Sequence, residues 1–285
     1  MANYQDATEL SKLTLGKTTQ YCSEYNADLL QGVPRSLNRD DLALNQVELP
    51  FVGEDVWYGY ELSWLNEKGK PVVAVAEFRF PCTSKNIVES KSFKLYLNSF
   101  NQTRFTNLKQ VEQILIEDLS KITDSAAKVK LFGVDHCPAL DINKSSGSYF
   151  CIDGEDISVD NYEYDAKILE QSQSEEASDI DEYLVSHLLK SNCLITNQPD
   201  WASIYIHYRG KTINHAALLS YLVSFRQHNE FHEQCVERIF CDLKTFCQLE
   251  ELTVFARYTR RGGLDINPFR SSHIEQAPNG RTLRQ

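Results

Sequence analysis

The sequence predicts an α+β protein with two related modules in one chain, each with an antiparallel sheet and helices on one face. Its length of 285 residues leaves room for two domains, because domains of about 150 residues are common. An internal repeat supports this division, as does the order of strand-like and helix-like patterns, which is the same in both halves.

The repeat is an ungapped match between residues 96–114 and residues 221–239, an offset of 125. Eight of the nineteen positions are identical, whereas chance matching gives about one. The identical residues of the first copy are Tyr96, Leu97, Ser99, Phe100, Gln102, Val111, Glu112 and Ile114. We interpret the match as a duplicated module.

Apolar periodicity gives each copy the order strands, two helices, strands. In the first copy these elements are expected as two strands at 56–65 and 72–80 with a turn at 66–71, helices from about 90 and at 108–122, and a strand at 129–134. In the second copy they are expected as a strand at 201–208, helices at 215–226 and 236–247, a strand at 253–258 and a turn at 260–263.

The charge of the chain is concentrated in one segment. Residues 153–182 hold twelve acidic residues and one basic residue, and so carry the whole net charge of −11. We interpret this stretch as a solvated acidic linker. The expected domains are therefore an N-terminal module at 1–150, a linker at 151–185 and a C-terminal module at 186–285.

Composition and patterning exclude several classes of protein. No apolar run approaches the roughly 18 residues of a membrane span, and the N-terminus resembles no signal peptide. The eight cysteines form no CxxC pair and are expected to be reduced thiols of a cytoplasmic protein. A neutral body with an acidic segment lacks the basic face of a nucleic-acid binder, which favours a small-molecule ligand.

The two copies differ in which polar cluster they keep. The first has Val88-Glu89-Ser90-Lys91 where the second has Ile213-Asn214-His215-Ala216, and only the second has the acidic and imidazole groups of residues 228–233. One interpretation is a composite site between modules to which each copy contributes half. The other is ordinary drift of solvated helix ends.

Three local patterns suggest chemistry. The first is the loop with Cys193 and Asp200, and the second is the spacing of His228, His232 and Cys235. Cys193 lies on a loop-like stretch before Asp200, where a thiol is a nucleophile if its thiolate is stabilised, although most such cysteines are structural. Asp200 is a candidate proton donor or a turn residue. His228, His232 and Cys235 have a spacing that would place three zinc ligands on one helical face.

A basic turn is the third pattern. Arg257, Arg260 and Arg261 beside Gly262-Gly263 would suit a phosphate group, or would be solvated arginines at the end of a hairpin. The sequence has no GxGxxG and no Walker A motif, so it predicts no Rossmann or P-loop nucleotide site.

Several of these segments together resemble one family, the NADPH-dependent 7-cyano-7-deazaguanine reductases in their long, bimodular form. The matching segments are Glu89-Ser90-Lys91-Ser92-Phe93-Lys94-Leu95-Tyr96, residues 221–226, residues 231–235, Cys193 to Asp200, and Arg260-Arg261-Gly262-Gly263. The resemblance implies two tandem tunnelling-fold modules and sites formed at module interfaces. It also implies reduction of the nitrile of 7-cyano-7-deazaguanine (preQ0) to the amine 7-aminomethyl-7-deazaguanine (preQ1) with two NADPH.

The resemblance assigns a role to each matching residue. Cys193 would attack the nitrile carbon and form a thioimide, and Asp200 would protonate the nitrogen. The substrate-binding residues would be Val88, Glu89, Ser90, His232 and Glu233, and the cofactor-binding residues would be Ser90, Lys91, Arg261 and Gly262. It implies no catalytic metal. The substrate is a free base, so no direct contact with nucleic acid is expected, and we expect a homodimer.

Two alternatives remain at this stage. Cyclohydrolases that share the implied fold use zinc, so a zinc-dependent cyclohydrolase is one alternative. The other is a non-catalytic module that binds a purine-like base.

Overall fold

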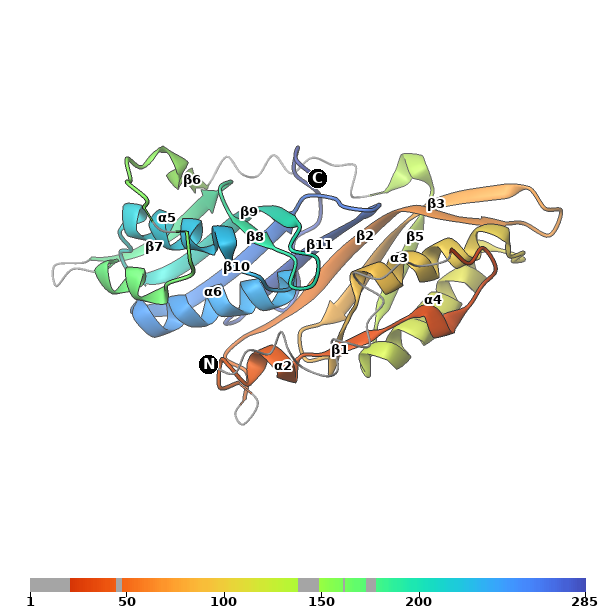
Figure 1. The fold of residues 1–285 in the computed structure, drawn as a ribbon, viewed down its shortest axis with the longest axis horizontal. Coiled ribbons are helices and arrows are strands. Elements are labelled where there is room, and N and C mark those ends of the chain that lie inside the picture. Colours follow the sequence, from red (N-terminus) through yellow and green to blue (C-terminus); the bar gives the residue numbers. More distant parts are fainter. Residues whose placement is uncertain (1–20, 45–47, 138–148, 161, 173–177) are drawn as a thin grey trace. The chain divides into compact units, whose positions relative to one another are not determined.

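The computed structural model describes residues 21–44, 48–137, 149–160, 162–172 and 178–285 (Figure 1). The chain forms two compact units. The first comprises Met1–Val47, Asp55–Asp141 and Arg260–Ile266, and the second comprises Glu48–Glu54, Ile142–Thr259 and Asn267–Gln285. These boundaries differ from the expected 1–150, 151–185 and 186–285, because residues 260–266 belong to the first unit although they lie near the C-terminus.

The first unit packs two helices against a sheet in which β5, β3 and β2 lie in that order. Figure 1 shows both helices, α3 and α4, on the same side of these strands. Its elements are η2 (Ala27–Leu29), β1 (Gly32–Pro34), α2 (Ser36–Arg39), β2 (Val52–Leu65), β3 (Pro71–Pro81), β4 (Asn86–Val88), α3 (Ser90–Ser99), η3 (Phe100–Gln102), α4 (Leu108–Thr123), β5 (Lys128–Phe132) and η4 (Val134–His136). The core of this unit lies between the sheet and the helices. It includes Trp57 and Phe78 from the strands and Phe93 and Leu115 from the helices, all of them buried.

The second unit repeats this plan. Its strands lie in the order β11, β10, β9, β7 and β6, and β8 pairs with β9. Its elements are β6 (Phe150–Cys151), η7 (Ile152–Gly154), η8 (Ala166–Gln171), β7 (Asp179–Ser186), β8 (Lys190–Asn192), β9 (Pro199–Lys211), α5 (His215–Ser224), η9 (Phe225–Gln227), α6 (His232–Phe246), β10 (Leu249–Tyr258) and β11 (Leu264–Ser271).

The sequence offset of 125 reappears in the backbone. Helix α5 begins and ends 125 residues after α3, and η9 follows η3 at the same offset. The Tyr96 hydroxyl donates a hydrogen bond to Asp118 in the first unit, and the Tyr221 hydroxyl donates one to Asp242 in the second. The two units therefore share a buried polar contact as well as an order of elements.

The predicted class, α+β, is confirmed, and each strand and helix expected from periodicity is present within a few residues of its expected bounds. Strand β6 pairs with β7 in parallel, whereas the pairs β3–β5, β7–β9, β8–β9, β9–β10 and β10–β11 are antiparallel. The pattern missed the short strands β1, β4, β6 and β8 and the longer strands β7 and β11. Strand β11 is buried along its whole length, so it lacks the alternation that marks a half-exposed strand.

The interpretation of residues 153–182 as a solvated linker is wrong for two stretches. Strand β7 includes residues 179–182 and pairs with β9, and η8 buries Leu169 completely. Acidic side chains alternate with Ile180 along β7, so a half-exposed strand explains the charge as well as a linker does. Residues 173–177 of the low-complexity stretch lie outside the described residues.

Candidate active site

Cys193 lies in the hairpin that joins β8 to β9. Its amide donates a hydrogen bond to the Gln198 carbonyl oxygen (2.8 Å), and its carbonyl oxygen accepts one from the Asn197 amide (3.0 Å). Asn197 has a left-handed φ of 54°, a conformation that asparagine tolerates better than most residues do. The tight loop holds the Cys193 side chain 4 % exposed.

Asp200 is fixed by the same hairpin, because it pairs with Ser191 two residues before the thiol. It is also buried, at 5 % exposure. Its Oδ1 lies 3.7 Å from Nε2 of His232, the first residue of α6. The hairpin and the start of α6 therefore bring a buried thiol, a buried carboxylate and an imidazole into one region of the second unit.

Helix α6 begins without a side-chain cap, since its N-cap Phe231 offers no acceptor. Glu233 lies in its first turn and is 2 % exposed, so its carboxylate is buried where the helix dipole favours negative charge. The His232 ring meets the Tyr258 ring edge to face at a centroid distance of 4.1 Å. This contact orients the imidazole.

Several residues around this region were missed by sequence reasoning. Tyr258 is buried at the end of β10, and burial together with Cys235 and Asp200 raises its pKa well above the usual value. Burial and the neighbouring Arg226 lower the pKa of Lys190, whose Nζ donates to the Arg226 carbonyl oxygen (2.7 Å). Their side chains carry no motif, so only the three-dimensional structure reveals them.

The proposed zinc triplet is contradicted by the helix boundary. His228 is the C-cap of η9 and precedes α6, so it does not share a helical face with His232 and Cys235. Its Nε2 lies 3.0 Å from Oε2 of Glu230. Over the residues that the structure describes, no group of three or more His, Cys, Asp or Glu side chains is arranged to hold a metal ion.

The first unit holds the other predicted residues. Val88 ends β4 and is buried, and Glu89 is the fully buried N-cap of α3. The Glu89 carboxylate accepts hydrogen bonds from the amides of Lys91 (2.8 Å) and Ser92 (2.7 Å). Ser90 and Lys91 form the first turn of the helix. Glu89 therefore has a structural role, whatever else it binds.

Arg261 and Gly262 belong to this first unit and lie in a tight turn. The Arg261 amide donates a hydrogen bond to the Leu264 carbonyl oxygen (2.9 Å), and the Leu264 amide donates one to the Arg261 carbonyl oxygen (3.2 Å). Gly262 and Gly263 have φ of 62° and 79°, the left-handed pair that a type I′ hairpin turn requires. A Cβ on Gly262 would lie 3.2 Å from Cδ of Lys94, which is on α3. The structure thus brings the basic turn against the helix that carries Ser90 and Lys91.

The interpretation of three arginines as one basic turn is wrong for Arg257. It is buried, belongs to the second unit, and donates a hydrogen bond to the Gly280 carbonyl oxygen. The Arg260 guanidinium stacks 3.9 Å from the Tyr60 ring centroid. The basic surface at this turn therefore comes from Arg260, Arg261 and Lys94.

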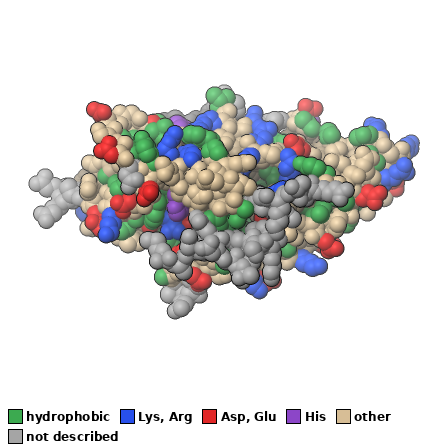
Figure 2. All heavy atoms as spheres, viewed as in Figure 1, with side chains coloured by type: hydrophobic (Ala, Val, Ile, Leu, Met, Phe, Trp, Pro, Cys, Tyr) green, Lys and Arg blue, Asp and Glu red, His purple; other side chains and the backbone are tan. Residues whose placement is uncertain are grey.

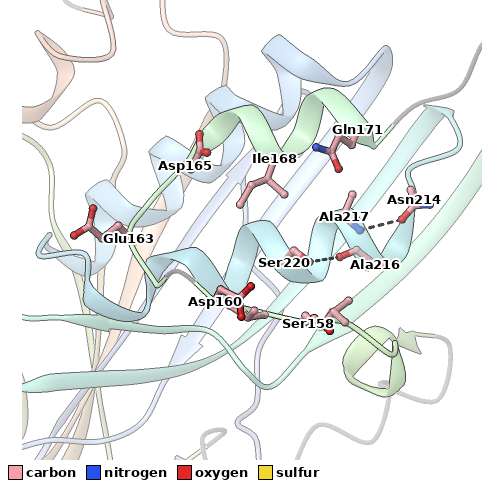
Figure 3. A pocket seen from close by; sticks show the side chains of 12 residues that line it. Ser158, Asp160, Glu163, Asp165, Ile168, Gln171, Asn214, Ala216, Ala217 and Ser220 are labelled. Atoms are coloured by element: carbon pink, nitrogen blue, oxygen red, sulfur yellow. Dashed lines mark hydrogen bonds between the residues drawn. The ribbon is translucent and has the colours of Figure 1, made fainter.

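A pocket of about 560 Å³ lies elsewhere in the second unit, and none of the predicted site residues lines it. Figure 3 shows Ala217 and Ser220 of α5 and its N-cap Asn214 on one side of it, and Ile168 and Gln171 of η8 on another. Asn214 and Ala216 occupy the positions that correspond to Glu89 and Lys91 at the offset of 125. The second copy thus has a pocket without cysteine, histidine or basic residues where the first has its charged cluster.

The described surface carries charges of both signs. Figure 2 shows acidic and basic side chains interspersed on the face drawn there. Among the described residues, the structure has no helix that is both long enough and apolar enough to cross a membrane.

Comparison with known proteins shows to which family the chain is similar. Residues 21–131 match the N-terminal domain of nitrile reductase (7-cyano-7-deazaguanine reductase), and residues 199–277 match the QueF-like protein family. The chain is 81 % identical, over 100 % of both chains, to the NADPH-dependent 7-cyano-7-deazaguanine reductase of Colwellia psychrerythraea. These similarities show that the chain belongs to the 7-cyano-7-deazaguanine (nitrile) reductase family.

Proposed function

We propose that this protein reduces the nitrile of preQ0 to the primary amine of preQ1 with NADPH, in queuosine biosynthesis. The grouping of Cys193, Asp200, His232 and Glu233 in one buried region supports this most directly. We further propose that the two units are tandem tunnelling-fold modules. The common offset of α3 and α5 supports that assignment.

The proposed chemistry begins at the thiol. The Cys193 thiol gives its proton to Asp200, and the sulfur forms a C–S bond to the nitrile carbon as one C–N π bond breaks. Nitrogen then takes that proton, and the product is a covalent thioimide. Asp200 supplies the proton to nitrogen, and its position on the same hairpin as Cys193 supports this role. A thioimide accepts hydride at carbon more readily than a nitrile does, so covalent attachment divides a difficult reduction into easier steps.

His232 and Glu233 are proposed to bind the substrate. A carboxylate accepts paired hydrogen bonds from a ring N–H and an exocyclic amino group of a guanine-like base, and Glu233 is buried, where such bonds are strong. His232 is oriented by Tyr258 and lies near Asp200, which suits assistance in proton transfer. Val88, Glu89 and Ser90 are further proposed substrate contacts.

Ser90, Lys91, Arg261 and Gly262 are proposed to bind NADPH, which supplies the hydride for each reduction step when it is bound. The exposed glycine turn against α3 fits this group, because Gly262 leaves its backbone accessible and Arg261 supplies positive charge for a phosphate. Lys94 beside the turn is ion-paired with Glu61 (3.4 Å). Arg261 offers bidentate hydrogen bonds that a lysine does not.

Replacing Arg261 by alanine is expected to raise the KM for NADPH roughly 10-fold, because one charge-assisted phosphate contact is lost. The affinity for preQ0 should stay within about two-fold of the original. Steady-state kinetics with each substrate varied in turn measures both. Arg260→Ala is the matched control, since the neighbouring guanidinium stacks on Tyr60; equal effects of the two variants would argue against a specific role for Arg261.

Asn214 is the counterpart of Glu89 in the second unit. Variants at the two positions distinguish the capping role of Glu89 from its proposed role in substrate binding. Asn214 caps α5 as Glu89 caps α3, so alanine at either position should reduce stability by about 1 kcal/mol. Only Glu89→Ala should also weaken preQ0 binding. Glu89→Asn keeps a capping side chain and removes the charge, so it should recover part of the stability but not the binding. Thermal unfolding and calorimetric titration with preQ0 test this, and unchanged binding in Glu89→Asn would leave Glu89 a cap alone.

Product analysis tests the proposed function. Protein incubated with preQ0 and NADPH should yield preQ1, identified by mass spectrometry, at a rate that a metal chelator leaves unchanged. A rate that falls with chelation and returns with zinc would favour a cyclohydrolase-like enzyme. Bound preQ0 that is never reduced would identify a binding module.

We propose a cytoplasmic homodimer, and light scattering coupled to gel filtration at several concentrations tests the dimer.

A further inference from the structure

A buried ion pair lies beside the region that holds Cys193 and His232. Glu230 is completely buried, and the Arg238 guanidinium contacts both of its carboxylate oxygens, with Nη2 at 2.7 Å from Oε1 and Nε at 3.1 Å from each oxygen. His228 contacts the same carboxylate at 3.0 Å. The Arg238 guanidinium also lies over the Tyr164 ring, at 5.1 Å from its centroid. None of these residues has a role in the chemistry proposed above.

The segment held by this pair is bonded to the chain just before the thiol. The Asn192 amide donates to the His228 carbonyl oxygen (2.8 Å), and the Glu230 amide donates to the Asn192 carbonyl oxygen (3.1 Å). Between them, the Asn229 side-chain amide points to the carbonyl oxygen of Cys193 at 3.4 Å. The Asn192 side-chain amide also donates to Oδ1 of Asn229 (3.3 Å), so four hydrogen bonds join residues 228–230 to residues 192–193.

The Asn229 side chain also reaches the far side of the loop. Its Nδ2 donates to Oδ1 of Asn197 (3.0 Å), the residue in the left-handed conformation. Asn229 thus bridges the first and the later residues of the loop that carries Cys193.

The same ion pair fixes the start of α6. Arg238 is on α6, and Glu230 lies two residues before His232, so the pair ties the incoming chain back onto the helix. Because Phe231 offers no side-chain cap, this tie replaces the usual restraint on the first turn. One ion pair therefore restrains both the loop with the thiol and the turn with His232 and Glu233.

We propose that Glu230, held by Arg238, is a positioning residue that sets the Cys193 thiol against the substrate held by His232 and Glu233. The inference rests on the proposed function, since it assumes that Cys193 attacks the bound nitrile. Attack needs the reacting atoms in a narrow range of geometry, and displacement by about 1 Å costs on the order of 10²-fold in rate. Loosening the loop should slow attack and leave the affinity for preQ0 nearly unchanged.

A second buried ion pair on α6 provides the control for stability. Glu237 is 1 % exposed and contacts Arg270 at 2.9 Å, within the same unit. Its partner Arg270 lies on β11, away in sequence from residues 192–193 and 228–230. Glu230→Gln and Glu237→Gln each remove one buried negative charge from a Glu–Arg pair, so both should lower Tm.

The experiment measures thioimide formation in a single turnover, with enzyme in excess over preQ0 and no NADPH. Glu230→Gln is expected to slow adduct formation by roughly 10–100-fold, while Glu237→Gln stays within about two-fold of the original. Affinity for preQ0, measured with each change placed in a Cys193→Ala background, should alter less than about three-fold in both. If the role of Glu230 were only structural, both variants would lower Tm and both would form the adduct at similar rates.

A third variant keeps the inference testable if Glu230→Gln does not fold. Asn229→Ala leaves the ion pair in place and removes the bridge to Cys193 and Asn197, so adduct formation should slow by about 10-fold at unchanged Tm. Equal rates in Glu230→Gln and Glu237→Gln, or an unchanged rate in Asn229→Ala, would overturn the positioning role alone. A wild-type protein that forms no adduct with preQ0 would overturn the proposed function and this inference with it.

Discussion

The rate of nitrile reduction by the Cys193→Ala variant is expected to be lower by about 10⁴-fold or more, because the covalent intermediate cannot form without the thiol. It should still bind preQ0, since the proposed ring contacts come from His232 and Glu233. Incubating the unmodified protein with preQ0 alone should add the mass of preQ0 to the peptide that contains Cys193. The variant should show no such increase.

Cys247→Ala is the matched control for this experiment. Cys247 is a buried thiol of the same unit, it contacts Ser172, and burial raises its pKa above the usual value. Its replacement should leave both turnover and adduct formation in place. Turnover retained by Cys193→Ala would remove that thiol from the mechanism.

Asp200→Asn is expected to slow adduct formation by about 10²-fold or more, because the amide keeps the shape of the side chain but has no acidic proton to give. The affinity for preQ0 should change little. Stopped-flow measurement of adduct formation, paired with titration in a Cys193→Ala background, separates the two effects. Asp181→Asn serves as the control, because Asp181 is an exposed carboxylate of the same unit that contacts His207. If Asp200→Asn forms the adduct at the original rate, the role of Asp200 is structural.

Much of the fold could be predicted from the sequence because the internal repeat shows the same pattern of elements twice. The 125-residue offset gave the positions of α3 and α5 correctly, and the alternation of apolar residues located β2, β3 and β9. Strand β11 was missed because burial on both faces removes the alternation. Strand β7 was missed because its acidic side chains resemble those of a solvated segment.

The candidate site was predictable only where a residue belongs to a motif. The resemblance gave Cys193, Asp200 and the residues of both helix starts. Spacing along the chain gave a wrong prediction for His228, because a helix boundary separates it from His232. It also gave a wrong prediction for Arg257, because this residue lies on a strand and is buried. Glu230 and Arg238 could not be paired from sequence, because eight residues separate them and their contact crosses the start of α6.

The most direct test of this account counts the NADPH oxidised per preQ0 consumed, with the amine product measured in the same samples. The account predicts two NADPH for each nitrile, with one preQ1 formed and no oxidation by Cys193→Ala. Oxidation of a single NADPH per nitrile with release of a partly reduced product, or oxidation at the original ratio by Cys193→Ala, would contradict it.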